Sequence, residues 1–264
     1  MSASTLKISD LPLRNAPLFI MLAYPLIHAV LGPPHLYADG TNFFLNILDK
    51  QGFWAWDTPR LFAQFISQFP LVIAIKIGVR SLVALGNIYS LSLLLLPALL
   101  WICAALAQRK SPIFWRIFLA YSLVYVPGSL FSVGEFNLCY ALNALIFSLL
   151  LLDCRETLPW SLLILLLSGL NALTYEVNFI LALPGILLLI NRIVHSASRC
   201  STFADAPLPS FRLLGKRFKG VSFDESFLNE MPFYIIRICL LASMFFYISS
   251  LIISLASILY PRSP

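Results

Sequence analysis

Three carboxylates stand at the ends of long apolar runs, and they are the side chains of this sequence best placed to do chemistry. They are Asp39 in Tyr-Ala-Asp-Gly, Glu135 in Val-Gly-Glu-Phe and Glu176 in Thr-Tyr-Glu-Val. An ionisable group at the rim of an apolar helical bundle is costly to keep, so it usually faces a cavity or a partner. A carboxylate in such a place can act as a general base toward a substrate hydroxyl.

Each acid also has a purely structural interpretation. Asp39 precedes an amphipathic segment, where an Asp side chain can cap a helix by accepting a backbone N–H. Ser132 and Glu135 have the spacing of a capping box, and an acid in the first turn also favours the positive end of the helix dipole. For Asp39 the cap and the functional acid stay equally open, whereas for Glu135 the pattern favours structure. Glu176 has no clean capping box.

The composition shows that these acids belong to a strongly apolar chain. Hydrophobic residues make up 59% of the chain and charged residues 11%, against about 25% charged in soluble domains. Several runs reach the roughly 20 apolar residues that cross a bilayer. The sequence therefore predicts an all-α transmembrane helical bundle of about seven spans, at 16–34, 83–107, 113–132, 135–152, 158–174, 176–193 and 232–259. The five scattered cysteines form no CxxC pair, so neither a disulfide framework nor a zinc site is expected.

The positions of the basic residues predict the orientation of the bundle. With a cytoplasmic N-terminus (1–15), 13 of the 18 Lys and Arg residues fall on the inner side or within reach of it, and 5 fall outside. The positive-inside rule favours this topology. It makes 194–231 a basic cytoplasmic loop, 16–193 the main transmembrane module and 232–264 a last span with a short outer tail. All three carboxylates then lie on the outer side.

The first outer loop, 35–82, is predicted to hold two amphipathic helices. The first has an apolar face of Phe43, Phe44, Ile47 and Leu48, which suggests a helix lying on the membrane surface. The second begins near Pro59 and alternates two faces, with Arg60, Gln64 and Gln68 opposite Phe62, Phe65, Ile66 and Phe69. Pro70 should kink or end it, and the apolar run 71–79 is then a candidate re-entrant segment.

Outer-side cations are the natural partners for an anion in this region. Arg60, Lys76 and Arg80 lie outside, against the trend of the other basic residues. They could bind a lipid phosphate, or simply contact anionic headgroups. His28, within the first span, is more typical of a hydrogen bond between helices than of a ligand.

The order of these parts resembles a known family. A first span, an outer-loop acid, two juxtamembrane helices and then paired spans, carried by Tyr37–Phe44 through Pro59–Arg60, are similar to the N-terminal module of GT-C type glycosyltransferases. These integral membrane enzymes take sugars from polyprenyl-phosphate donors. The resemblance implies that Asp39 is the general base or helps to hold the site, and that Arg60, with Lys76 or Arg80, binds the donor phosphate.

The resemblance covers about residues 1–195, with two departures. Gly40 stands where many members have a second acid, and the chain is shorter than most members. It implies membrane lipids and a polyprenyl-phosphate-linked sugar as partners, and a bacterial inner (plasma) membrane as the location. No nucleic acid is expected, because the cluster Arg212–Lys219 fits a topogenic role. The sequence identifies no cofactor or metal.

Two other interpretations stay open. In a transporter or lipid-handling protein, Glu135 and Glu176 would line a polar path near the outer leaflet. In a non-catalytic subunit of a membrane complex, Gly128, Gly169 and Gly185 would be packing sites for helices.

The predicted topology can be tested by cysteine labelling. Single cysteines at Asp49 and at Ser210, in a cysteine-free background, should react with an impermeant thiol reagent from opposite sides of intact membranes, because the basic residues place these positions on opposite sides. Reaction of both from one side would overturn the seven-span arrangement and the grouping of the three acids.

Overall fold

The computed structural model is all-helical over the part of the chain that it describes, as predicted. It describes residues 14–32, 36, 39–54, 60–131, 135–152, 157–174, 179–201, 235–249 and 251–252. The helices are α1 (Asn15–Leu31), α2 (Asp39–Lys50), α3 (Leu61–Lys76), α4 (Leu82–Ala107), α5 (Ile113–Ala120), the π-helical turn η5 (Tyr121–Tyr125), α6 (Val126–Phe131), α7 (Glu135–Leu150), α8 (Leu158–Ala172) and α9 (Phe179–Ser201). A C-terminal helix follows at Ile235–Ser249.

Among the described residues, two helical stretches are long and apolar enough to cross a membrane. They are Leu82–Ala107, which is 26 residues long, and Ile113–Leu130, which runs from α5 through η5 into α6. The other apolar helices have 15 to 17 described residues each: Asn15–Leu31, Leu61–Lys76, Phe136–Leu150, Leu158–Ala172, Ile180–Val194 and Ile235–Ser249. At 1.5 Å per residue these apolar stretches are shorter than the roughly 30 Å hydrocarbon core, although α9 as a whole has 23 residues. Two helices therefore meet the criterion, where seven spans were predicted.

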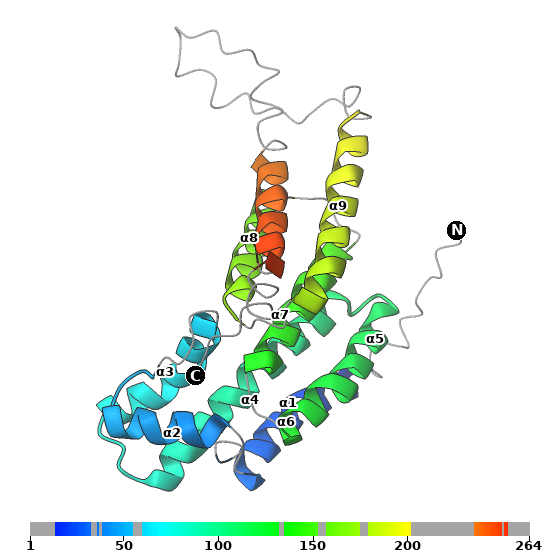
Figure 1. Cartoon of the computed structure of the whole chain (residues 1–264). Helices are drawn as coiled ribbons and strands as arrows, with labels where there is room; N and C mark the ends of the chain where they lie inside the picture. The colour runs from blue at the N-terminus through cyan, green and yellow to red at the C-terminus, as the bar shows by residue number, and fades with distance from the viewer. Residues whose placement is uncertain are drawn as a thin grey trace, which may run out of the picture.

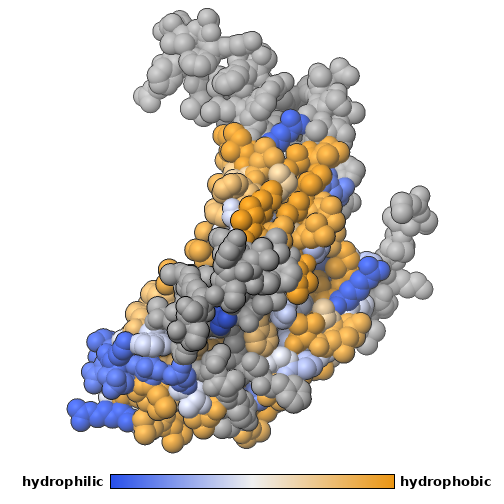
Figure 2. All heavy atoms as spheres, viewed as in Figure 1, coloured by the Kyte–Doolittle hydropathy of each residue, from blue (hydrophilic) through white to orange (hydrophobic). Residues whose placement is uncertain are grey.

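The helices expose much of their apolar surface (Figure 2). Along α1, Phe19, Val30 and Leu31 are each more than two-thirds exposed, and α5, α8, α9 and the C-terminal helix also carry exposed Leu, Ile and Phe side chains. A monomeric soluble protein rarely presents contiguous apolar patches of this extent. The faces are typical of helices that contact lipid or another apolar partner.

Long-range contacts show the relative directions of α1, α4 and α5–α6. At one end of α1, Arg14 donates to the carbonyls of Arg109 and Ser111, between α4 and α5. At its other end, His28 Nε2 donates to the carbonyl of Ser129 in α6 at 3.1 Å. Helix α1 therefore runs parallel to α5–α6 and antiparallel to α4, which lies against both (Figure 1).

Helix α4 joins two hydrophobic clusters. Its first half packs Leu85 and Tyr89 against Phe43, Phe44 and other apolar side chains of α2 and α3. Its second half packs the side chains Ala98, Trp101, Ala104 and Ala105 against α1, α5 and η5. Helix α7 also lies along α4, and Gln108 at the end of α4 donates to the carbonyl of Ser148. Helices α2 and α3 are thus attached to the rest through α4, and α3 also through the bond from the Phe62 N–H to the Leu173 carbonyl.

A proline in α1 leaves one backbone carbonyl without its helical hydrogen bond, and a tyrosine side chain supplies the missing donor. Pro25 has no N–H, so the carbonyl of Met21 loses its helical donor. The Tyr121 hydroxyl donates to that carbonyl at 2.8 Å. Nearby, Tyr125 donates to the carbonyl of Leu94 in α4 at 2.6 Å. Backbone groups in an apolar interior must find such partners, so the tyrosines of η5 hold α1 and α4 in register.

Small residues let the last helices approach closely, as predicted for packing glycines. A Cβ on Gly185 of α9 would lie 2.8 Å from the ring of Tyr247 in the C-terminal helix, and one on Gly128 would lie 2.9 Å from the Asn137 amide oxygen. Gly169 is in ordinary contact with Phe246. Figure 1 shows α8, α9 and the C-terminal helix side by side at the end of the molecule away from α2.

One expectation about the predicted segments was wrong, and two were incomplete. The apolar face of α2 is buried against α3 and α4 and does not lie on a membrane surface. Of the predicted kink or end at Pro70, the end does not occur: α3 continues to Lys76, because Leu71, Val72 and Ala74 are buried against α2 and α4. Helix α9 runs on to Ser201, into the predicted cytoplasmic loop 194–231.

Substitution of Tyr121 and of Tyr125 tests whether their hydroxyls stabilise the backbone of α1 and α4. Tyr121→Phe should lower the free energy of unfolding by about 1–3 kcal/mol, because the buried Met21 carbonyl is left without a donor. Tyr125→Phe is the matched variant and should cost about 0.5–1.5 kcal/mol, since the Leu94 carbonyl keeps the N–H of Ala98 within α4. Denaturant unfolding of the purified protein, followed by fluorescence, measures both. Equal losses would contradict the role given to Pro25.

Candidate functional site

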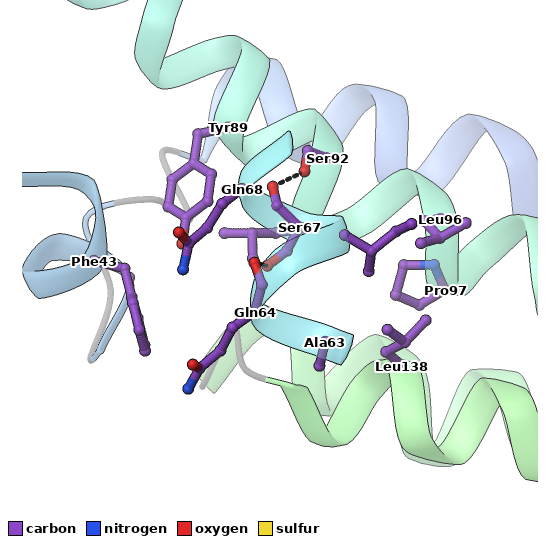
Figure 3. Close-up of a pocket in the computed structure, with 13 residues that line it drawn as sticks. Phe43, Ala63, Gln64, Ser67, Gln68, Tyr89, Ser92, Leu96, Pro97 and Leu138 are labelled. Carbon is purple, nitrogen blue, oxygen red and sulfur yellow. Dashed lines mark hydrogen bonds between the residues drawn. The ribbon is translucent and has the colours of Figure 1, made fainter. Parts of the chain in front are cut away.

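A small cavity, mainly apolar but with several polar side chains in its wall, lies between α2, α3, α4 and α7. Its volume is about 30 Å³, room for one or two water molecules. The polar side chains that line it come from α3 and α4: Gln64, Ser67, Gln68, Tyr89 and Ser92. Figure 3 shows Gln64 and Gln68 on the side of α3 that faces Phe43 of α2, with Ala63, Leu96, Pro97 and Leu138 at the other side.

The glutamines reveal that α3 is inverted relative to a surface helix. The predicted two faces are present, but Gln64 and Gln68 are 3% and 1% exposed, whereas Phe65 and Phe69 are 48% and 43% exposed. Phe53 stacks on Phe65 with ring centroids 4.7 Å apart. A helix that buries its amides and exposes its aromatic rings suits an apolar surrounding, because a buried amide can find partners inside the protein, as Gln68 does.

Gln68 holds the segment after α2 in place. The backbone N–H of Trp54 donates to Gln68 Oε1 at 2.8 Å, and Gln68 Nε2 donates to the Trp54 carbonyl at 2.6 Å. The Lys50 ammonium lies 3.8 Å from the centre of the Trp54 ring, a cation–π contact. One side chain of α3 thereby positions the C-terminal end of α2 and the chain beyond it.

Backbone oxygens add to the polarity of the cavity walls. The Ser92 hydroxyl of α4 donates to the Ser67 carbonyl of α3 (Figure 3). Pro70 and Pro97 have no N–H, so the carbonyls of Ile66 and Leu93 lose their α-helical donors. Ile66 and Leu93 both line the cavity. Hydroxyl, amide and carbonyl groups therefore meet in one small space that can bind water or the polar part of a ligand.

The elements place three of the predicted site residues near this cavity. Asp39 begins α2 and is followed by Gly40, a cavity residue. Half-buried Arg60 precedes α3, three residues before the lining residue Ala63. Glu135 begins α7, three residues before the lining residue Leu138. The side chains of Asp39 and Glu135, and the whole of Glu176, lie outside the described residues.

Lys76 and Arg80 are not brought to the same place. Helix α3 has 16 residues, about 24 Å, and separates Arg60 from Lys76. Lys76 and Arg80 are exposed and lie near the start of α4. One phosphate cannot contact both ends of α3, so Arg60 is the predicted cation that remains beside the cavity.

A second polar group lies between α1, α6 and α7. As expected for a histidine within a span, His28 makes a hydrogen bond between helices, and Tyr24 completes it by bonding to the Ser129 hydroxyl at 2.7 Å. Asn137 of α7 is 1% exposed, and neither its amide nitrogen nor its amide oxygen has a hydrogen-bond partner among the described residues. In the described part of the chain no three His, Cys, Asp or Glu side chains come together as a metal site would require.

The sequence had shown Gln64 and Gln68 as one face of a helix, but it did not show that they line a site. The missed residues are Ser67, Tyr89 and Ser92, whose signal was a few polar groups within apolar runs. Comparison with profiles of protein families, with curated proteins and with solved structures found no match to this chain. The function must therefore be argued from these side chains and their surroundings.

Gln68→Leu tests the link between α3 and the segment after α2. It removes both bonds to Trp54 and should lower the free energy of unfolding by about 2 kcal/mol or more, because two backbone groups lose their partner. Ser67→Ala is the control on the same helix and should cost under about 1 kcal/mol, since the Ser67 hydroxyl donates to the carbonyl of Gln64 within α3. Thermal unfolding compares the two. A similar loss in both variants would remove the special role of Gln68.

Proposed function

We propose that this chain is an integral membrane protein of seven spans that transfers a sugar from a polyprenyl-phosphate donor at the outer face of the membrane. The first part of the proposal is supported by two long apolar helices, by apolar outer faces on the other helices, and by the inverted amphipathicity of α3. The shorter apolar helices can cross with polar ends at the headgroups or with local thinning of the bilayer. The antiparallel arrangement of α1 and α4, and of α4 and α5–α6, is compatible with such a bundle.

The observation that carries sugar transfer is the meeting of two helix starts at this one cavity. Helix α2 begins with an acid, Asp39, and its second residue lines the cavity. Helix α3 follows Arg60, and its fourth, seventh and eighth residues contribute polar side chains to the cavity wall. Along the chain, Asp39 and Arg60 are thus each within about one helical turn of a residue that lines the same cavity.

These two groups suit the two ends of the reaction. The acceptor hydroxyl attacks the anomeric carbon of the sugar, and the bond between that carbon and the phosphate oxygen breaks. Asp39 takes the hydroxyl proton as general base. Arg60 pairs with the departing polyprenyl phosphate and stabilises the charge that develops on it.

The buried amides would serve the sugar. Gln64, Gln68 and Ser92 offer donors and acceptors close to the proposed reaction centre, and sugar hydroxyls are recognised by groups of this kind. The cavity as it stands has room for water but not for a sugar, so a substrate must displace Phe43 or the start of α2. The exposed aromatic face of α3, with Phe65 and Phe69, lies beside it and can contact the isoprenoid chain.

The Asp39→Asn variant is the most direct test of the enzymatic part of the proposal. Asn caps a helix about as well as Asp, so the variant should fold and insert normally. It lacks the basicity of a carboxylate, and loss of a general base typically lowers the rate about 10²–10⁴-fold. Sugar transfer to an acceptor in reconstituted proteoliposomes, across a series of polyprenyl-phosphate sugars, measures the effect. Full activity in this variant would exclude Asp39 as the base.

The two ends of α3 provide the comparison for phosphate binding. Arg60→Ala should raise the KM for the donor and also lower kcat, because it removes a contact to the leaving phosphate. Lys76→Ala should do neither, since Lys76 lies about 24 Å away along the helix. The reverse result would move the phosphate site to the start of α4. Solute flux without any product would instead favour a transporter.

A further inference from the structure

The tight turn between α4 and α5 is the most basic place among the described residues, and it lies at the opposite end of α1 from the proposed transfer site. Arg109 and Lys110 lie in it, Arg116 follows in α5, and Arg14 approaches from the start of α1. No Asp or Glu occurs between Asp10 and Asp39 or between Asp57 and Glu135. The helices α1, α4, α5 and α6 and the turns between α4, α5 and α6 therefore bring no acid to balance these cations.

Two of the arginines are held by reciprocal bonds. Arg14 is 5% exposed; its Nη1 donates to the carbonyls of Arg109 and Ser111, and its guanidinium carbon lies 5.3 Å from the centre of the Phe114 ring. In return, Arg109 Nη2 donates to the Asn15 side-chain oxygen at 2.5 Å. Both side chains are thus fixed, and two positive charges are kept close together.

One buried N–H donor of these two arginines has no hydrogen-bond partner among the described residues. It is the Nε of Arg109, and the partners of Arg14 are neutral oxygens. Lys110 and Arg116 are exposed beside them. Like charges held together raise each other's energy, so an anion shared between them would be bound favourably.

The surroundings indicate which anion fits. Leu106 and Trp115, on either side of the turn, are 45% and 44% exposed. Cations next to exposed apolar side chains at the end of long apolar helices match a ligand that carries phosphate and acyl chains together, and basic pockets at this depth bind anionic lipid headgroups. A free phosphate would use the cations but leave the apolar neighbours uncovered.

We propose that the α4–α5 turn is a specific site for the phosphate headgroup of an anionic phospholipid, with Arg109 and Lys110 as the main contacts and Arg116 as a further one. Arg14 is a positioning residue that holds the turn. The site depends on α4 and α5 crossing a bilayer and is independent of sugar transfer. Bound lipid would tie α1, α4 and α5 together at this end of the bundle.

The test uses the full chain in a neutral detergent and follows thermal unfolding by tryptophan fluorescence. Short-chain phosphatidylglycerol should raise the Tm in a saturable way, while phosphatidylcholine and inorganic phosphate at the same concentrations should raise it much less. In R109Q/K110Q the half-saturating concentration of phosphatidylglycerol should increase about 10- to 30-fold, from the loss of two cations near a headgroup.

The control is K50Q/K76Q, which removes the same charge from exposed positions on α2 and α3 and should change the half-saturating concentration less than twofold. An equal change in both double variants would show diffuse attraction and overturn the site. So would equal protection by phosphatidylcholine, or by inorganic phosphate, which would indicate a free-anion site. If R109Q/K110Q does not fold, K110Q/R116Q replaces two exposed cations and should still weaken the response several-fold; an unchanged response there overturns the proposal.

Discussion

The structure depends on satisfying backbone groups inside an apolar assembly. Pro25 and Pro97 each remove a donor from a helix that has little water beside it, and a free carbonyl there is costly. Tyr121 supplies the missing donor to α1, and Tyr125 bonds to α4 one residue from the carbonyl that Pro97 frees. Because both hydroxyls come from the same π turn, they fix α1 and α4 relative to each other. Helix α4 carries that register to α3 through the bond from Ser92 to Ser67.

The long helices were predictable because the ends of an apolar run in the sequence lie close to the ends of the helix. Runs at 16–34, 83–107 and 113–132 correspond to α1, α4 and the helix from α5 to α6 within a few residues. The orientation of α3 was not predictable in the same way. Amphipathic spacing separates Gln68 from Phe69, but it does not say whether the surroundings of the helix are water or an apolar medium. The orientation of α3 is set by tertiary contacts, chiefly the hydrogen bonds between Gln68 and Trp54.

The candidate site was predicted in part. Asp39 and Arg60 stand out as charges in an apolar chain, and their places at the starts of α2 and α3 follow from local helix signals. The cavity beside them joins side chains that are far apart in sequence, such as Gln64 and Ser92. Single serines in apolar helices have no distinctive pattern, since a hydroxyl can bond back to its own helix. The separation of Lys76 from Arg60 follows simply from the unbroken length of α3.

The π turn at 121–125 changes the phase of the helix that contains it. An α-helix advances each residue by about 100°, and a π turn accommodates one residue more per hydrogen-bonded ring than an α-helix does. Side chains after the turn therefore point about 100° away from where an unbroken helix would aim them. In this shifted orientation Ser129 forms hydrogen bonds with Tyr24 and His28. A related chain with one residue fewer in this stretch would keep its hydrophobicity but lose these bonds, so the length of the segment is constrained as strictly as its composition.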